Sequence, residues 1–242
     1  MKRNFLDEFK HKKPIFAMLH LKGDSDEEVL ERAKREIAIY QEHGVDAVIV
    51  ENYFGHYYHM EKVLTYITEE CPDLVYGINC LKNDAMAFDL AKRFHPLFLQ
   101  FDSVSGHLKP RDDVTYEAFI KKYRSECDVY ILGGVRFKYQ PYLSGRTLDE
   151  DMNIAMTRCD AIVVTQDATG QETSMDKVKE FRSILKEFPL IIGAGLTVEN
   201  CKEQLAVADG AIVGSYFKDT YKDTGDVDAT HVDTLLNAVH AL

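Results

Sequence analysis

The chain has 242 residues, of which 45% are hydrophobic and 29% are charged, as in ordinary globular domains. Its 29 Lys and Arg residues against 40 Asp and Glu residues give a formal net charge of -11. A nucleic-acid-binding protein needs a positive surface, and no basic tract is longer than His11-Lys12-Lys13, so the composition argues against such a partner. The negative charge also opposes adhesion to an anionic membrane.

The hydrophobic and cysteine patterns indicate the cellular location of the protein and the state of its thiols. No run of about 18 apolar residues predicts a transmembrane helix, and the charged N-terminus does not resemble a signal peptide, so we expect a cytoplasmic protein. The five cysteines are odd in number and form no CxxC pair, which disfavours a disulfide framework and a zinc knuckle.

From Pro14 onward, short β-branched or aromatic runs alternate with amphipathic segments, at a spacing of roughly 30 residues. The predicted strands are 14–20, 46–51, 75–79, 97–102, 128–138, 161–166, 189–194 and 210–215. The predicted helices are 26–43, 57–70, 84–94, 115–125, 147–158, 174–187, 197–206 and 228–241. Four of these helices have a predicted N-cap at their start: Ser25, Thr147, Ser174 and Thr197.

The order of these elements predicts an α/β fold. The strands are almost continuously apolar, as in a parallel sheet covered on both faces. Eight strand-helix pairs in one domain predict a (β/α)8 TIM barrel over residues 1–242, with residues 1–13 as an N-terminal extension. An open doubly wound sheet is the alternative, but it needs a glycine-rich turn after the first strand, which residues 20–24 do not provide.

In such a barrel the functional site lies at the carboxyl ends of the strands. Polar residues and glycines gather there: His20, Lys22, Glu51, Asn52, Asn79, Asp102, Ser105, Lys138, Gln166, Asp167, Gly193, Gly195, Gly214 and Ser215. Core packing favours apolar side chains in strands, so this set predicts a binding site at the rim of the barrel, to which Asn52 and Asn79 would contribute ligand contacts.

A phosphate site is predicted after the seventh and eighth strands, at Gly193, Gly195, Gly214 and Ser215. Glycines let a phosphate approach backbone N–H groups closely, and the start of a following short helix attracts the same oxygens. Gly170 could add a further amide. The alternative is that these glycines only allow tight turns between strands and helices.

Four side chains are candidate catalytic groups. Lys138 could act as a cation or as a nucleophilic amine, and its alternative is a salt bridge at the rim. Glu51 and Asp102 come from alternate strands and could form an acid/base pair or bind Mg²⁺. His20 could carry a proton near neutral pH, or be an ordinary hydrogen-bonded rim histidine.

Several catalytic patterns are missing from the sequence. There is no His-x-His on the first strand, and no GxSxG, P-loop or HExxH motif. No residue is therefore assigned as a metal ligand, and no cofactor is predicted apart from the Mg²⁺ alternative.

The strand-end motifs, in their order along the chain, resemble the BtpA/SgcQ family. They are Met18-Leu19-His20-Leu21, Val50-Glu51-Asn52, Gly77-Ile78-Asn79 with Asn83-Asp84-Ala85, Asp102-Ser103-Val104-Ser105-Gly106, Val135-Arg136-Phe137-Lys138, Asp160 to Val164, Gly193 to Asn200 and Asp209 to Ser215. The resemblance covers the chain from about residue 14 to its end. It implies a phosphate-binding type of barrel, in a family whose best-known members are named for photosystem I biogenesis or are encoded beside sugar-uptake genes.

This chain departs from the family pattern in places that shape the pocket. Lys22-Gly23-Asp24 replaces a proline-rich turn, Gln100 stands where an arginine is usual, and residues 165–170 replace a glycine- and serine-rich loop. The resemblance thus implies a divergent member whose ligand differs from that of typical relatives.

Three functional hypotheses follow. The first is an enzyme, an isomerase, epimerase or aldolase-type lyase, that acts on a small phosphorylated molecule such as a sugar or nucleoside phosphate. The second is a non-catalytic assembly factor for a membrane complex, with an apolar surface patch away from the rim. The third is a metal-dependent phosphohydrolase. The sequence leaves open whether the chain forms a homo-oligomer.

Overall fold

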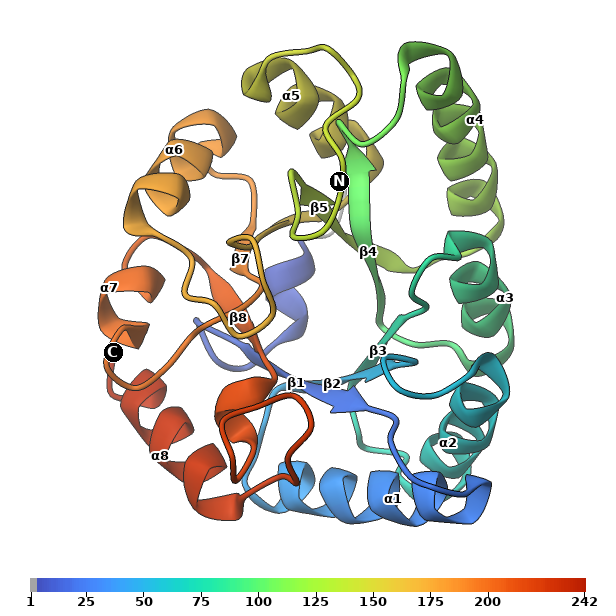
Figure 1. Cartoon of the computed structure of the whole chain (residues 1–242), viewed down its shortest axis with the longest axis vertical. Coiled ribbons are helices and arrows are strands. Elements are labelled where there is room, and N and C mark those ends of the chain that lie inside the picture. Colours follow the sequence, from blue (N-terminus) through green and yellow to red (C-terminus); the bar gives the residue numbers. More distant parts are fainter. Residues whose placement is uncertain (1–3) are drawn as a thin grey trace.

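A computed structural model describes residues 4–242 as a closed barrel of parallel strands in the order β1 to β8. Figure 1 shows the strands in the centre, enclosed by a ring of helices. The predicted (β/α)8 barrel is confirmed. No helix in the described part of the chain is long and apolar enough to cross a membrane.

The strands are β1 (Ile15–His20), β2 (Ala47–Glu51), β3 (Tyr76–Asn79), β4 (Phe98–Ser105), β5 (Tyr130–Val135), β6 (Ala161–Val164), β7 (Leu190–Ile192) and β8 (Gly210–Val213). The α-helices are α1 (Asp26–Glu42), α2 (Tyr57–Glu70), α3 (Asp84–Phe94), α4 (Pro110–Glu126), α5 (Leu148–Arg158), α6 (Met175–Leu185), α7 (Cys201–Leu205) and α8 (Ala229–His240). Two 3-10 turns, η1 (Phe5–Glu8) and η2 (Ser215–Phe217), complete the described elements.

Several predicted boundaries were wrong, and three of them have a clear physical reason. The strand predicted over 128–138 is β5, which stops at Val135 because Arg136 has the left-handed φ of 47°. The helix predicted over 115–125 starts earlier, with Pro110 in its first turn, where the missing N–H of proline costs no hydrogen bond. Strand β4 continues past the predicted end at residue 102, because pairing with β5 resumes at Ser105 after an irregularity.

Three of the four predicted N-caps are confirmed. Ser25, Thr147 and Ser174 each accept a hydrogen bond from a backbone N–H in the first turn of α1, α5 and α6. Thr197 was predicted wrongly, because α7 begins only at Cys201. Residues 197–200 form a turn instead, in which the Thr197 N–H donates to the Asn200 Oδ1 at 2.8 Å.

The alternation of side chains along each strand divides the core into two parts. Outward-facing residues such as Leu19, Val50 and Leu99 pack against the helices. The barrel interior is filled by a separate cluster that includes Phe16, Met18, Ala47, Ile49, Phe98, Leu132, Ala161, Val163, Ile191 and Ile212. Going up β1 and β2, the next inward positions are His20 and Glu51, so the interior turns polar at the carboxyl ends.

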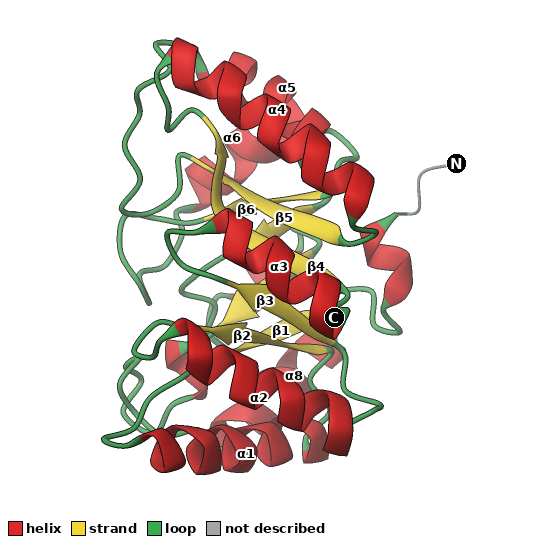
Figure 2. Cartoon of the chain, turned by 90° about the vertical axis from the view of Figure 1, so that its right-hand side faces the viewer, coloured by secondary structure: helices red, strands yellow, loops and turns green. Residues whose placement is uncertain are grey.

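The predicted N-terminal extension closes the opposite end of the barrel; its residues 1–3 lie outside the described part. Phe5 of η1 is 1% exposed and makes edge-on ring contacts with Phe16, Phe98 and Tyr130. In Figure 2 this turn lies at the right of the barrel and the longer strand-to-helix loops lie at the left. The main cavity, described below, lies at the opposite, loop-bearing end of the barrel.

Candidate functional site

The cavity at the carboxyl ends of the strands has a volume of about 710 Å³. Nine of the predicted site residues line it: His20, Glu51, Asp102, Lys138, Gly170, Gly193, Gly195, Gly214 and Ser215. The four predicted catalytic residues and most of the predicted ligand-binding residues therefore line one cavity.

Strand pairing aligns three polar side chains on one side of the cavity. His20 pairs with Glu51 between β1 and β2, and Glu51 pairs with Asn79 between β2 and β3. The Glu51 carboxyl therefore lies between its two neighbours: one oxygen is 3.3 Å from the His20 Nε2 and the other accepts from the Asn79 Nδ2 at 2.7 Å. We refer to His20, Glu51 and Asn79 as the polar row.

A second carboxyl group continues the polar row toward β4. The Asn79 Nδ2 also donates to the Asp102 Oδ1, at 3.4 Å. Burial, together with the charge of Asp102, raises the pKa of Glu51 to about 8, although Lys138 and the Asn79 hydrogen bond oppose the shift. Burial also raises the pKa of Asp102. Glu51 is thus protonated at neutral pH, in a pair of linked carboxyl groups.

His20 is neutral at the same pH. Burial, together with the positive charges of Lys218 and Lys138, lowers its pKa to about 3. A neutral imidazole 3.3 Å from a protonated carboxyl can accept the proton of that carboxyl in a hydrogen bond. The ring stacks on Tyr53, with centroids 4.8 Å apart, which fixes its orientation.

Lys138 lies in the turn after β5, and not in the strand as predicted. Its backbone N–H donates to the Thr165 Oγ1 at 2.8 Å, which joins the β5–α5 loop to the end of β6. Its charge acts on His20, Glu51 and Asp102, so its ammonium group belongs electrostatically to the same site.

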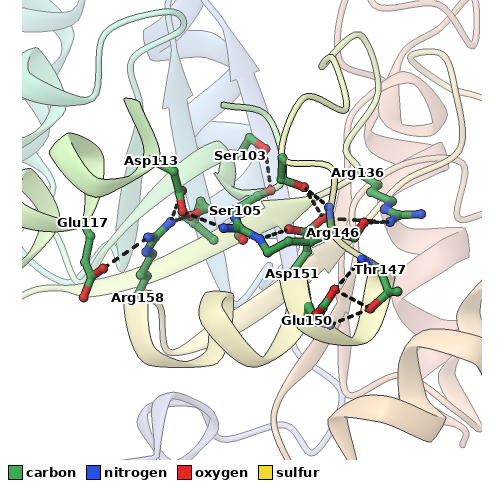
Figure 3. A network of polar contacts seen from close by, with 12 residues as sticks. Ser103, Ser105, Asp113, Glu117, Arg136, Arg146, Thr147, Glu150, Asp151 and Arg158 are labelled. Carbon is green, nitrogen blue, oxygen red and sulfur yellow. Dashed lines mark hydrogen bonds and ion pairs between the residues drawn. The ribbon is translucent and has the colours of Figure 1, made fainter. Parts of the chain in front are cut away.

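A network of buried ion pairs holds the β5–α5 loop that carries Lys138 (Figure 3). Arg146 in this loop binds Asp151 of α5 at 2.9 Å and Asp113 of α4 at 3.0 Å. Asp113 also binds Arg158, which is 3% exposed, at 2.7 Å. This network was not predicted from the sequence, although Asp151 and Arg158 lie on the same buried stripe of α5 as Ala155.

The glycines form the β7–β8 side of the cavity. Gly195 has a φ of 75°, which favours glycine. A Cβ built on it would lie 2.4 Å from the Gln171 carbonyl oxygen, so close packing is a second reason for glycine at this position. The Gly193 N–H is already bonded to the Val164 carbonyl. Gly214 brings the β8 backbone beside His20, because a Cβ there would be 3.3 Å from the imidazole Cε1.

The β6–α6 loop, residues 165–174, covers part of this cavity. The Thr169 N–H donates to the Tyr139 hydroxyl at 3.0 Å, and the Thr169 hydroxyl lies 3.4 Å from the Tyr53 hydroxyl. Tyr53 follows β2, which lies across the barrel from β6, and Figure 1 shows this loop reaching toward the centre of the barrel. Gly170 sits next to Thr169, close to the Ser215 hydroxyl.

Two predicted ligand contacts do not line this cavity. The Asn52 Oδ1 accepts from the Leu81 N–H at 2.8 Å and so ties two loops together. Asn79 instead lines a second cavity, of about 400 Å³. Asp102 lines both this cavity and the main one. This second cavity contains Asp84, whose pKa is raised to about 6 by burial.

Other residues of the main cavity were missed as site residues, among them Lys82, Gln100, Tyr139 and Tyr221. Gln100 had a sequence signal, since it is a polar residue inside an otherwise apolar strand. Lys82, Tyr139 and Tyr221 lie in loops, where no periodicity assigns a direction to a side chain.

The Mg²⁺ alternative concerns Glu51 and Asp102. Both oxygens of Glu51 already have polar neighbours, the His20 Nε2 and the Asn79 Nδ2. Within residues 4–242, the three-residue group able to converge on a metal is His11, Asp46 and His240, where Asp46 directly precedes β2 and His240 ends α8.

A family model described as "BtpA family" matches residues 11–241. The chain belongs to the BtpA family. An uncharacterised protein of Thermococcus kodakarensis is 29% identical over 86% of this chain and 87% of its own length. The photosystem I biogenesis protein BtpA of Synechocystis is 26% identical over 96% and 89%, and the putative sgc region protein SgcQ of Escherichia coli is 23% identical over 94% of both.

Solved structures share the fold of this BtpA-family chain. One described as "Native KDPGal structure" has a TM-score of 0.64 at 14% identity, covering 95% of this chain and 96% of that chain. The phosphoribosyl anthranilate isomerase of Thermotoga maritima has a TM-score of 0.62 at 14% identity, covering 95% and 100%. At such identities the likeness establishes the fold alone.

Proposed function

We propose that the protein is an enzyme that moves a proton on a small phosphorylated metabolite, in a reaction of the isomerase, epimerase or aldolase type. The observation that carries the proposal is the Glu51 carboxyl, 5% exposed yet lining the cavity, with its pKa raised to about 8. A group with a pKa near the working pH both gives and takes a proton efficiently.

The neighbouring side chains supply complementary roles. Glu51 acts as the acid in its protonated form, and neutral His20 orients that proton. Asp102, linked to Glu51 through Asn79, acts in its ionised form as the base that takes a proton from the substrate carbon. The Lys138 ammonium stabilises negative charge that develops on a substrate oxygen, or forms a Schiff base with a carbonyl in the aldolase version.

The phosphate is proposed to bind on the β7–β8 side, at Gly195, Gly214 and Ser215. In a protein with a net charge of -11, the field that attracts the phosphate must be local, from backbone N–H groups and from Lys138 or Lys82. Two proteins with the same fold are named for phosphorylated compounds, phosphoribosyl anthranilate isomerase and thiamine phosphate pyrophosphorylase, which supports the proposal.

Deuterium exchange tests the proposal without knowledge of the net reaction. The protein is incubated in D₂O with a panel of aldose and ketose phosphates, and proton NMR follows the loss of C–H signals beside the carbonyl. We expect exchange with at least one compound, and Glu51→Gln to slow it by about 10² to 10⁴-fold, as when a general acid/base is lost.

A control variant and a trapping experiment accompany the exchange measurement. Glu187→Gln, at an exposed position between α6 and β7, should exchange at the wild-type rate. Borohydride treatment with a ketose phosphate should label Lys138 if the aldolase version is correct. Binding of these compounds without any exchange would contradict the enzyme proposal.

The assembly-factor hypothesis called for an apolar patch away from the rim. The most exposed large apolar side chains instead border the strand-to-helix loops: Phe54, Tyr58, Met86, Val114, Tyr139, Tyr142, Leu143 and Tyr221 all lie in such loops or near the starts of the following helices, while Leu242 ends the chain. Their positions fit a ligand entrance better than a separate docking face.

A further inference from the structure

We propose that the ligand carries a hydroxyl or amino group at the end remote from its phosphate, and that Glu51, Gln100 and Asp102 receive this group. We call these three residues the acceptor floor. The inference rests on the proposed function, because it assumes a phosphate on the β7–β8 side, and it adds the chemical class of the other end of the ligand.

Gln100 supplies the first argument. It lies between Phe98 and Asp102 in the alternation of β4, so its side chain points into the barrel, where it lines the main cavity and is 4% exposed. Its Oε1 is buried and has no hydrogen-bond partner within residues 4–242. A buried acceptor without a donor is unfavourable, so a ligand that donates to it binds more tightly.

The charges around Gln100 supply the second argument. Glu51 and Asp102 line the same cavity, and the charge of Asp102 raises the pKa of Glu51, so negative charge is already disfavoured there. A carboxylate or second phosphate of the ligand would bring a further negative charge beside these two carboxyl groups. A hydroxyl or ammonium group would donate to them instead.

The second cavity extends this acceptor chemistry. Asp102 lines both cavities, and beyond it lies the carboxyl of Asp84, within 2.7 Å of the Tyr116 hydroxyl. This hydroxyl also lies 3.2 Å from the Ser103 carbonyl oxygen. A polyol or amino-sugar phosphate, with several donors in a row, fits this arrangement better than a ligand with a single polar group.

Calorimetric titration at neutral pH with four probes tests the inference: inorganic phosphate, glucose 6-phosphate, glucosamine 6-phosphate and 6-phosphogluconate. The last three share the phosphate and differ at the other end. We expect the first two sugar phosphates to bind at least about tenfold more tightly than 6-phosphogluconate, since this ratio corresponds to one good hydrogen bond or avoided charge repulsion.

Variants of Gln100 assign the effect to the acceptor floor. Gln100→Met, similar in size but without the acceptor, should reduce the preference to less than about threefold, and Gln100→Arg should reverse it in favour of 6-phosphogluconate. Gln41→Leu, on the exposed face of α1, is the control and should keep the full preference. Thermal unfolding of each variant verifies that it is folded.

The outcomes separate the inference from the proposed function. If inorganic phosphate binds but 6-phosphogluconate binds as tightly as the other sugar phosphates, or if Gln100→Met keeps the full preference, the acceptor floor is overturned and the phosphate site stands. If no probe binds, inorganic phosphate included, the phosphate site itself is overturned and the inference falls with it.

Discussion

The two ends of the barrel are built from the same strands and differ completely in chemistry. At the amino end, the inward residues are aromatic and aliphatic, and Phe5 closes the opening from outside the sheet. At the carboxyl end, two residues further along β1 and β2, the inward residues are His20 and Glu51. The comparison indicates that the amino end supplies the packing that allows the carboxyl end to hold buried polar groups.

The largest expected effect is at the amino end. Phe5→Ala should lower the free energy of unfolding by about 3 to 5 kcal/mol, because it removes a buried ring and leaves a cavity. Phosphate binding by the folded protein should not change. Phe54→Ala is the matched control: this ring is 40% exposed at the carboxyl end, and its loss should cost under about 1 kcal/mol. Equal costs in a denaturant titration would contradict the comparison.

Gly195→Ala tests how tightly the carboxyl end is packed on the β7–β8 side. Its φ of 75° alone should cost about 1 to 2 kcal/mol, as for any L-residue. The 2.4 Å approach to the Gln171 carbonyl should add to this cost and displace the β6–α6 loop. Gly145→Ala separates the cost of the φ angle from the cost of the close approach, since Gly145 has a φ of 70° and a Cβ built on it would have no atom within 4 Å. A cost for Gly195→Ala no larger than that of the control would show that the loop adapts freely.

Glu51→Gln tests the burial of the carboxyl group itself. The pKa of Glu51 is raised from 4.5 to about 8, so the native state holds a proton that the unfolded state releases in this range. Stability linked to this proton is present below pH 4.5 and is lost as the pH rises toward 8, with a slope of at most about 1.4 kcal/mol per pH unit.

The variant should therefore be more stable than the wild type at pH 8, with a difference that shrinks toward pH 4.5. The lowered pKa of His20 acts in the opposite direction between about 3 and 6.5, so the comparison is clearest above pH 6.5. Denaturant titrations at several pH values measure the difference. A difference independent of pH would mean that Glu51 is charged in the native protein.

The smallest expected effect concerns the cover of the carboxyl end. Tyr53→Phe removes a hydroxyl that lies 3.4 Å from the Thr169 hydroxyl, and should cost at most about 1 kcal/mol of global stability. Hydrogen exchange in residues 166–173 should accelerate. Tyr123→Phe on α4, away from this loop, should leave that exchange unchanged. Unaltered protection in Tyr53→Phe would show that Tyr139 and Gly195 hold the loop without Tyr53.

The sequence predicted the barrel and nine of the residues that line the main cavity, because strand periodicity shows where each strand ends. His20 and Glu51 could be found since each ends an apolar run, and both line the cavity. The contacts of Glu51 with His20 and Asn79 depend on strand register, which a single sequence does not reveal. The turn that carries Lys138 was missed because left-handed φ angles at Arg136 and Tyr139 are unusual for these residues.

The ion pairs of Asp113 and Arg158 were missed for a different reason. Periodicity identifies which face of a helix is buried, but assigns charged residues to solvent by default. Pairing between α4 and α5 overrides that default, since each charge meets a partner of opposite sign.

The polar row has a consequence for changes in the loops above it. His20, Glu51 and Asn79 occupy paired positions on neighbouring strands, so their spacing is set by backbone hydrogen bonds, about 4.8 Å from strand to strand. Insertions or replacements in the loops above leave that spacing unchanged. Changes to the turn at residues 22–24 or to the loop at 165–170 can thus alter the surroundings of the cavity without moving the polar row.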